Sequence, residues 1–225
     1  MKKIKLNIQL FGGRGAYSYG GSTKGGKLKK GRSHPSEQLD VSALANFPVK
    51  IQREFEEFMD MKSPEVEYGY MIDKNGKVVA GARGTKTGVG IHYEGSQEGF
   101  TVTHNHPDGY GGTFSGADIN HLTTQKLKSI RAVAREGTYS ITAKKGANYD
   151  GLNRALARDL NKVATSGSVK ASKVRAKGGN GNSVRKAYVD ELHKWYQKNA
   201  SKYGFTYSFT ANKSYNINAR RKLRK

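Results

Sequence analysis

Residues 100–109, FTVTHNHPDG, join a short β-strand pattern to two histidines and a turn. Residues i and i+2 of a strand point to the same side, so His104 and His106 are expected to present both imidazoles to one face. Asp118 follows about a dozen residues later and can join them if the loop folds back. A His-His-Asp set leaves the fourth position of a tetrahedral zinc ion open, as in catalytic zinc sites. The stretch therefore predicts a metal site at a strand end.

Each of these residues also has a purely structural interpretation. Ser115 and Asp118 have the spacing of a helix capping box, in which a serine caps the helix and an acid three residues later bonds back to it. Asn105 and the segment 107–109 are typical of an ordinary turn, and a histidine pair on a strand can simply be polar surface. The two interpretations are compatible, because a capping aspartate can still reach a metal.

The motif HNHP followed by SxxD, here 104–107 and 115–118, resembles the signature of JAB/MPN (JAMM) zinc metallopeptidases, especially their RadC-like prokaryotic relatives. The resemblance covers roughly residues 65–142 and implies a mixed β-sheet flanked by helices, in an α+β or α/β fold. It further implies zinc ligands, an oxyanion helper and a catalytic glutamate on an upstream strand beside a glycine. The implied residues are the ligands His104, His106 and Asp118, the helper Ser115, and the glutamate Glu67, with Glu65 as the reserve.

His121 lies three residues after Asp118, on the same face of the expected helix. It can support a ligand from behind or substitute for one. The other interpretation is an ordinary exposed histidine on a helix.

Composition restricts the remaining possibilities. The chain has 225 residues, 35% hydrophobic content and no cysteine, so a metal site must use His, Asp or Glu. The net charge of +22 predicts attraction to polyanions such as DNA. Residues 161–189 hold seven Lys or Arg and no acid, whereas residues 47–120 hold seven against eleven acids. No apolar run approaches the length of a transmembrane helix, so no membrane span is expected.

Patterning along the chain predicts three parts. Residues 1–46 are expected as a flexible, basic, Gly-rich arm that begins with a short alternating strand, and 211–225 as a basic tail. Between them, 47–210 are expected as one domain, with a helix from about residue 48, strands near 66–72, 77–82 and 100–103, and helices at 115–129 and 150–163. A hairpin is expected over 130–142, and the Gly-rich segment 84–90 is expected as a connection. A basic linker is expected at about 165–182, then a helix and a final strand within 183–210.

The first functional hypothesis is a JAMM-type zinc hydrolase that cuts a peptide or isopeptide bond in a protein or peptide substrate. RadC-like domains also occur in phage proteins, and the opening KLNIQLFGGRG is similar to the start of phage capsid-region proteins. The expected location is therefore the cytoplasm of a bacterial host, or the virion. The second hypothesis is a non-catalytic, DNA-associated virion or accessory protein with a structural or vestigial metal site. A metal-dependent nuclease is a third class that the positive charge leaves open.

Overall fold

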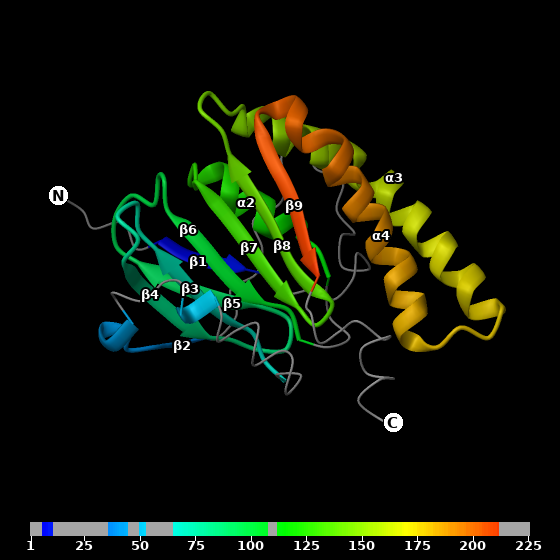
Figure 1. Ribbon diagram of the computed structural model, residues 1–225, viewed down its shortest axis with the longest axis horizontal. Coiled ribbons are helices and arrows are strands. Elements are labelled where there is room, and N and C mark those ends of the chain that lie inside the picture. Colours follow the sequence, from blue (N-terminus) through cyan, green and yellow to red (C-terminus); the bar gives the residue numbers. More distant parts are fainter. Residues whose placement is uncertain (1–5, 11–35, 45–49, 53–64, 108–111, 212–225) are drawn as a thin grey trace.

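The computed structural model describes residues 6–10, 36–44, 50–52, 65–107 and 112–211 (Figure 1). The expected tail at 212–225, most of the expected Gly-rich arm and most of the helix expected from residue 48 lie outside these residues. Of that helix, residues 50–52 are helical, and Ile51 is buried. Among the described residues, no helix combines the length and the apolar character needed to cross a bilayer.

The described residues form a mixed α and β fold, with nine strands in two sheets. The strands are β1 (Leu6–Leu10), β2 (Glu37–Gln38), β3 (Tyr68–Ile72), β4 (Val78–Arg83), β5 (Val89–Tyr93), β6 (Thr101–Asn105), β7 (Ser129–Ala134), β8 (Gly137–Ala143) and β9 (Phe205–Ala211). The described α-helices are α2 (Gly116–Thr124), α3 (Tyr149–Ala176) and α4 (Gly181–Asn199), with short 3-10 turns η2 (Ser42–Leu44) and η3 (Ala200–Tyr203).

The main sheet has the order β2-β4-β3-β6-β7-β8-β9, and only β6 and β7 run parallel to one another. Strand β1 pairs with β5 in a separate two-stranded sheet. Helix α2 is the connection between the parallel strands β6 and β7, and it packs against α3 and β1. The carboxyl end of β6, which carries the two histidines, therefore lies beside the start of α2.

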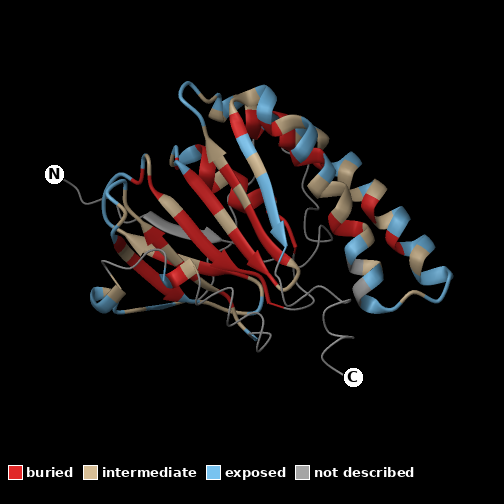
Figure 2. Ribbon diagram, in the orientation of Figure 1, coloured by how far each residue is buried: buried red, intermediate tan, exposed pale blue. Residues whose placement is uncertain are grey.

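The largest hydrophobic core lies between the sheet and its helices. It joins alternate residues of the strands, such as Val102 and Ile130, to Leu122 of α2 and Leu156 of α3. A smaller cluster, which includes Val78 and Val133, lies apart from this core. Figure 2 shows the buried residues concentrated in the central strands. Alternation along β6 thus directs His104, like Val102, toward the helix-covered face.

Several sequence predictions are confirmed. The strands near residues 66–72 and 77–82 form the hairpin β3–β4, and the hairpin over 130–142 is β7–β8. The last strand is β9, and Gly204 before it takes the left-handed conformation, with φ of 77°.

Other predictions were wrong. The arm expected up to residue 46 contains β2, which pairs with β4, so residues 36–44 belong to the folded domain. The Gly-rich segment 84–90, expected as a connection, contains the start of β5, and Val89 and Ile91 are fully buried. The helix expected to run to residue 129 ends at Thr124, because Ser129 begins β7.

The prediction of a basic linker at about 165–182 was also wrong. Most of this segment is helical, because α3 continues to Ala176 and α4 begins at Gly181. One small residue of this segment, Gly167, serves the packing of the two helices. A Cβ atom at Gly167 would lie 2.8 Å from the ring of Tyr188, so glycine allows α3 and α4 to approach closely. Gly178, with φ of 79°, then makes the turn between the two helices.

Candidate metal centre

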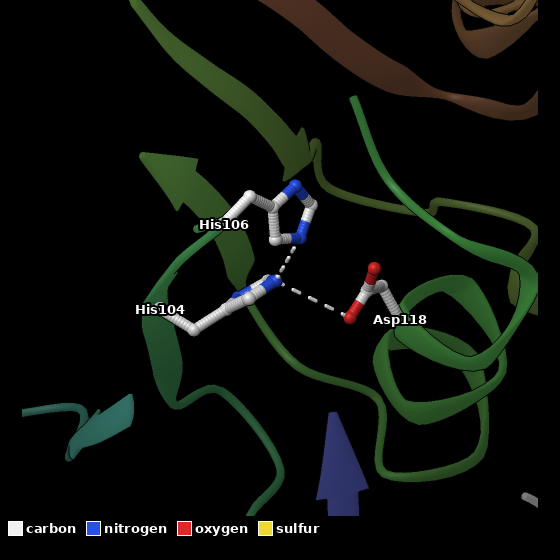
Figure 3. Close-up of side chains that lie close together, drawn as sticks. All are labelled: His104, His106 and Asp118. Atoms are coloured by element: carbon white, nitrogen blue, oxygen red, sulfur yellow. Dashed lines mark hydrogen bonds and ion pairs between the residues drawn. The ribbon is translucent and has the colours of Figure 1, made fainter. Parts of the chain in front are cut away.

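The two histidines and Asp118 converge on one point, as the spacing predicted (Figure 3). The Nε2 atoms of His104 and His106 are 2.9 Å apart, and Asp118 Oδ1 is 3.4 Å from His104 Nε2. All three ligand atoms lie within 4.8 Å of one another. Two of these side chains come from the end of β6 and the third from the first turn of α2, so the β6–α2 connection assembles the group.

Two of the three ligand separations fit a tetrahedral metal ion. Ligand atoms about 2.0–2.2 Å from a zinc ion at tetrahedral angles lie roughly 3.3 Å from one another. The observed separations of 2.9 and 3.4 Å lie on either side of that value. Asp118 Oδ1 is buried and makes no hydrogen bond to the protein, although the other oxygen of the same carboxylate is bonded. A divalent cation would satisfy a buried carboxylate oxygen that faces the Nε2 atom of His104, with the Nε2 atom of His106 beside it.

Hydrogen bonds at the far side of His106 fix which nitrogen faces the other ligands. His106 Nδ1 lies 3.2 Å from the carbonyl oxygen of Gly112, so Nδ1 carries the proton and donates it to that carbonyl. Nε2 is then left with a lone pair directed at His104 and Asp118. Metal-binding histidines are commonly oriented in this way.

Asp118 is held by Ser115, which is the N-cap of α2. The Ser115 backbone N–H and hydroxyl both donate to Asp118 Oδ2, at 2.7 and 2.8 Å, and the hydroxyl accepts from Asp118 N at 3.2 Å. The capping box and the ligand position therefore coexist, because Oδ2 serves the cap and Oδ1 points to His104. In this arrangement the Ser115 hydroxyl is engaged with Asp118, so its predicted oxyanion role stays a prediction.

Burial sets the electrostatics of the group. It raises the pKa of Asp118 from its ordinary 3.8 to about 7, against the opposing effect of the Ser115 hydrogen bonds. It also holds the pKa of His104 well below its usual range, and the neighbouring His106 and His121 lower that pKa further. His104 is therefore neutral and available as a ligand, and the buried Asp118 carboxyl holds its proton more readily than an exposed aspartate does. A bound cation would replace that proton and favour the carboxylate form.

Glu67 lies on the same face as the histidine pair. Gly69 of β3 is directly opposite His104 of β6, and Glu67 precedes Gly69 by two residues, so its side chain points to the same side. Glu67 is fully buried, and its backbone bonds to Gly84 and Thr85 keep it extended. The reserve candidate Glu65 lies in an exposed bend outside the strand. The structure thus favours Glu67 of the two glutamates.

Asn105 is a residue whose role the sequence interpretation missed. It was expected as part of a turn, but it ends β6 and is fully buried. Its Oδ1 accepts a hydrogen bond from the Tyr68 N–H at 2.6 Å, and its Nδ2 donates to the Val66 carbonyl at 3.2 Å. These two backbone groups flank Glu67. Asn105 therefore ties the segment that carries Glu67 to the strand that carries both histidines.

His121 lies outside the group of convergent ligand atoms. The interpretation as an exposed helical histidine is wrong, because only 4% of its surface is exposed. Its Nε2 lies 3.0 Å from Gln97 Oε1. Burial lowers its pKa to about 3, so it is a neutral residue near the centre rather than a member of it.

The C-terminal elements hold the segment between the histidines and Asp118. Tyr207 of β9 bonds through its hydroxyl to Thr113 Oγ1 at 2.8 Å and to His193 Nδ1 at 2.9 Å. Tyr196 of α4 donates to the Phe114 carbonyl at 3.2 Å. His193 of α4 belongs to this network through its bond to Tyr207. Parts of the chain far from the motif thus position the carbonyl that orients His106.

Comparisons of the chain with protein-family models, with curated proteins and with solved structures found no match in any of the three. The resemblance to JAB/MPN metallopeptidases therefore rests on the motif residues of the sequence.

Proposed function

We propose that the protein is a zinc-dependent hydrolase of the JAB/MPN (JAMM) class that cleaves a peptide or isopeptide bond. One observation carries the proposal: His104 Nε2, His106 Nε2 and Asp118 Oδ1 converge, with Glu67 buried on the same face of the sheet. Three protein ligands and a separate buried acid are the components of a catalytic zinc site. The mixed sheet with α2 between its parallel strands is compatible with this class.

Each residue has a distinct task in the proposed reaction. Zinc held by the three ligands would act as a Lewis acid and bring the pKa of a coordinated water toward neutrality. Glu67 would accept a proton from the attacking water and deliver it to the leaving amine. Ser115 is partly exposed at the edge of the buried group. Its hydroxyl could turn from Asp118 to a developing oxyanion while its backbone N–H kept Asp118 in place.

The test compares Glu67→Gln with the matched variant Glu65→Gln, because both carry the same change two residues apart and only Glu67 is buried on the histidine face. Hydrolysis of peptide and isopeptide-linked substrates is measured beside zinc content. We expect Glu67→Gln to keep its zinc and to lose about 10²–10⁴-fold in hydrolysis rate, the usual contribution of a general base. Glu65→Gln should match the wild type. Wild-type hydrolysis by Glu67→Gln would overturn the assignment of the base.

A second function is favoured by the complete burial of the ligands. His104 and Asp118 have no exposed surface, and His106 has 1%. A non-catalytic, DNA-associated virion or accessory protein could use such a centre to hold β6 to α2, with the net charge of +22 providing the affinity for DNA. In that case removal of zinc would destabilise the fold, and the zinc-loaded protein would hydrolyse none of the substrates. Under this alternative, as under the hydrolase proposal, the protein would be phage-encoded and located in the bacterial host or in the virion.

A further inference from the structure

The joined ends of the two long helices form a projection that carries none of the three candidate metal ligands. We define the helical arm as residues 161–189, the second half of α3, the turn and the first half of α4. Figure 1 shows it extending beyond the edge of the sheet. The first half of α3 packs into the main core through Leu152 and Leu156, but the arm has its own small cluster around Ala171 and Tyr188. The arm is therefore a two-helix unit supported mainly by itself.

Charge on the arm is of one sign. The arm holds seven basic residues and no acid: Lys162, Lys170, Lys173, Arg175, Lys177, Arg185 and Lys186. Lys170 bonds to Glu191 and Lys186 to Asp190, both acids just beyond the arm. Lys173 and Lys177 are exposed and make no ion pair with the described residues. Lys162 is also exposed and makes no such pair with them, but its charge helps to lower the pKa of Asp159, one turn earlier in α3. Lys173 and Lys177 are thus cations for which the described residues provide no acidic partner.

These lysines share one side of α3. At about 100° per residue, Lys162, Lys170, Lys173 and Lys177 fall within an arc of roughly 80°, and Arg175 lies on the opposite side. We call these four residues the lysine stripe. At 1.5 Å per residue the stripe is about 22 Å long. A DNA duplex carries a phosphate about every 1.7 Å of its axis, so the stripe matches the length of several base pairs.

The exposed apolar and aromatic side chains of the arm indicate which class of polyanion it is suited to contact. A helix that binds a membrane surface needs an apolar face. Among the described residues of the arm, the only exposed large hydrophobic side chain is Val169. Proteins that bind single strands stack bases on exposed aromatic residues. The one aromatic residue of the arm, Tyr188, is buried. The stripe is therefore better suited to phosphate contact with a duplex than to a membrane surface or to a single strand.

We propose that the lysine stripe of the α3–α4 arm binds the phosphate backbone of duplex nucleic acid. The contact is expected to be independent of sequence, because phosphate contacts fix the position of a protein on a duplex and carry no sequence information directly. The inference does not depend on the hydrolase activity. It assigns the contact to α3 and the turn that follows it, which the structure describes.

The test uses the full-length protein and fluorescence anisotropy with a short duplex of mixed sequence over a range of salt. The variant Lys162→Gln/Lys173→Gln/Lys177→Gln removes three cations and keeps good helix formers. With a salt slope of about 0.9 for each phosphate contact, we expect the slope to fall by about 2.7 and the duplex Kd to rise about hundredfold at roughly 0.15 M salt. Circular dichroism establishes that the helices are retained.

Two controls separate the stripe from general charge. The variant Lys128→Gln/Lys144→Gln/Lys145→Gln removes three exposed cations elsewhere, and Arg175→Gln removes one from the opposite side of α3. Both should change the slope by less than about 1. Equal losses in the two triple variants, or no loss in the stripe variant, would overturn the proposal. So would tighter stripe-dependent binding to single strands or to vesicles containing phosphatidylserine.

Discussion

Asp118→Asn should make the metal-free protein more stable at pH 8 while abolishing its affinity for metal. Burial raises the pKa of Asp118 to about 7 in the folded protein, whereas an exposed aspartate titrates near 3.8. Between these values the folded state holds a proton that the unfolded state has released. The stability that this group contributes is therefore fully present below about pH 4 and is lost as pH rises through 7.

The size of the effect follows from the same shift. Each pH unit of this window corresponds to 1.36 kcal/mol, so the interval from 3.8 to about 7 gives an upper value of about 4 kcal/mol. Asparagine keeps an oxygen acceptor for both Ser115 donors, which now bond Oδ2, and carries no charge. We expect Asp118→Asn to exceed the wild type by up to about 4 kcal/mol at pH 8 in chelator, and to match it near pH 4.

The assay is urea unfolding at pH 4 to 8 in chelator, repeated with zinc. Asp159→Asn is the matched control, because Arg158 holds the pKa of Asp159 below its ordinary value, and its replacement should lower stability at pH 8 instead of raising it. Free zinc at about 100 times its Kd should stabilise the wild type by about 2.7 kcal/mol and leave Asp118→Asn unchanged. If Asp118→Asn is no more stable than the wild type at pH 8 in chelator, the buried-charge argument is refuted.

Three further substitutions probe the surroundings of the centre. Asn105→Ala should lower the free energy of unfolding by about 2–4 kcal/mol, because two buried backbone groups lose their partners. It should also reduce the rate of hydrolysis while zinc is retained. The control Asn153→Ala, at another buried asparagine, should lower the free energy of unfolding without reducing hydrolysis. His121→Gln should keep its zinc, measured by elemental analysis, because it lies outside the ligand group; loss of zinc would make it a ligand. Gly112→Ala should weaken zinc binding, measured by calorimetry, about 10–100-fold, because the added Cβ atom would meet the methyl groups of Val189. The double variant Gly112→Ala/Val189→Ala should restore zinc binding, because it removes those methyl groups.

The parts of the fold that sequence predicted are those with local causes. Alternation in 100–103 and 205–209 marked β6 and β9, and the capping spacing of Ser115 and Asp118 marked the start of α2. The convergence of His104 and His106 with Asp118 could be predicted because residues i and i+2 of a strand share a face and a single short connection leads from β6 to α2. Each of these needs only a short window of residues.

The missed features depend on distant partners. Asn105 resembles a turn residue until β3 is placed beside β6, because its bonds reach back to Val66 and Tyr68. The composition of 165–182 predicted a linker. In the structure Gly167 lies against Tyr188 of α4, and this contact exists only because the two helices pack together. His121 was expected to be exposed, and Gln97 lies against it from a loop 24 residues earlier. Tertiary packing overrides local composition in each case.

The most direct measurement of the central claim is the metal content of purified protein, determined by elemental analysis after expression without added metal. It should be made on the wild type, on Asp118→Ala and on the exposed-acid control Glu65→Ala. The account predicts about one zinc ion per chain in the wild type and in Glu65→Ala, and a sharp reduction in Asp118→Ala. The absence of metal from all three proteins, with none taken up when zinc is supplied, would contradict it. Ser115 and Asp118 would then be a helix cap alone.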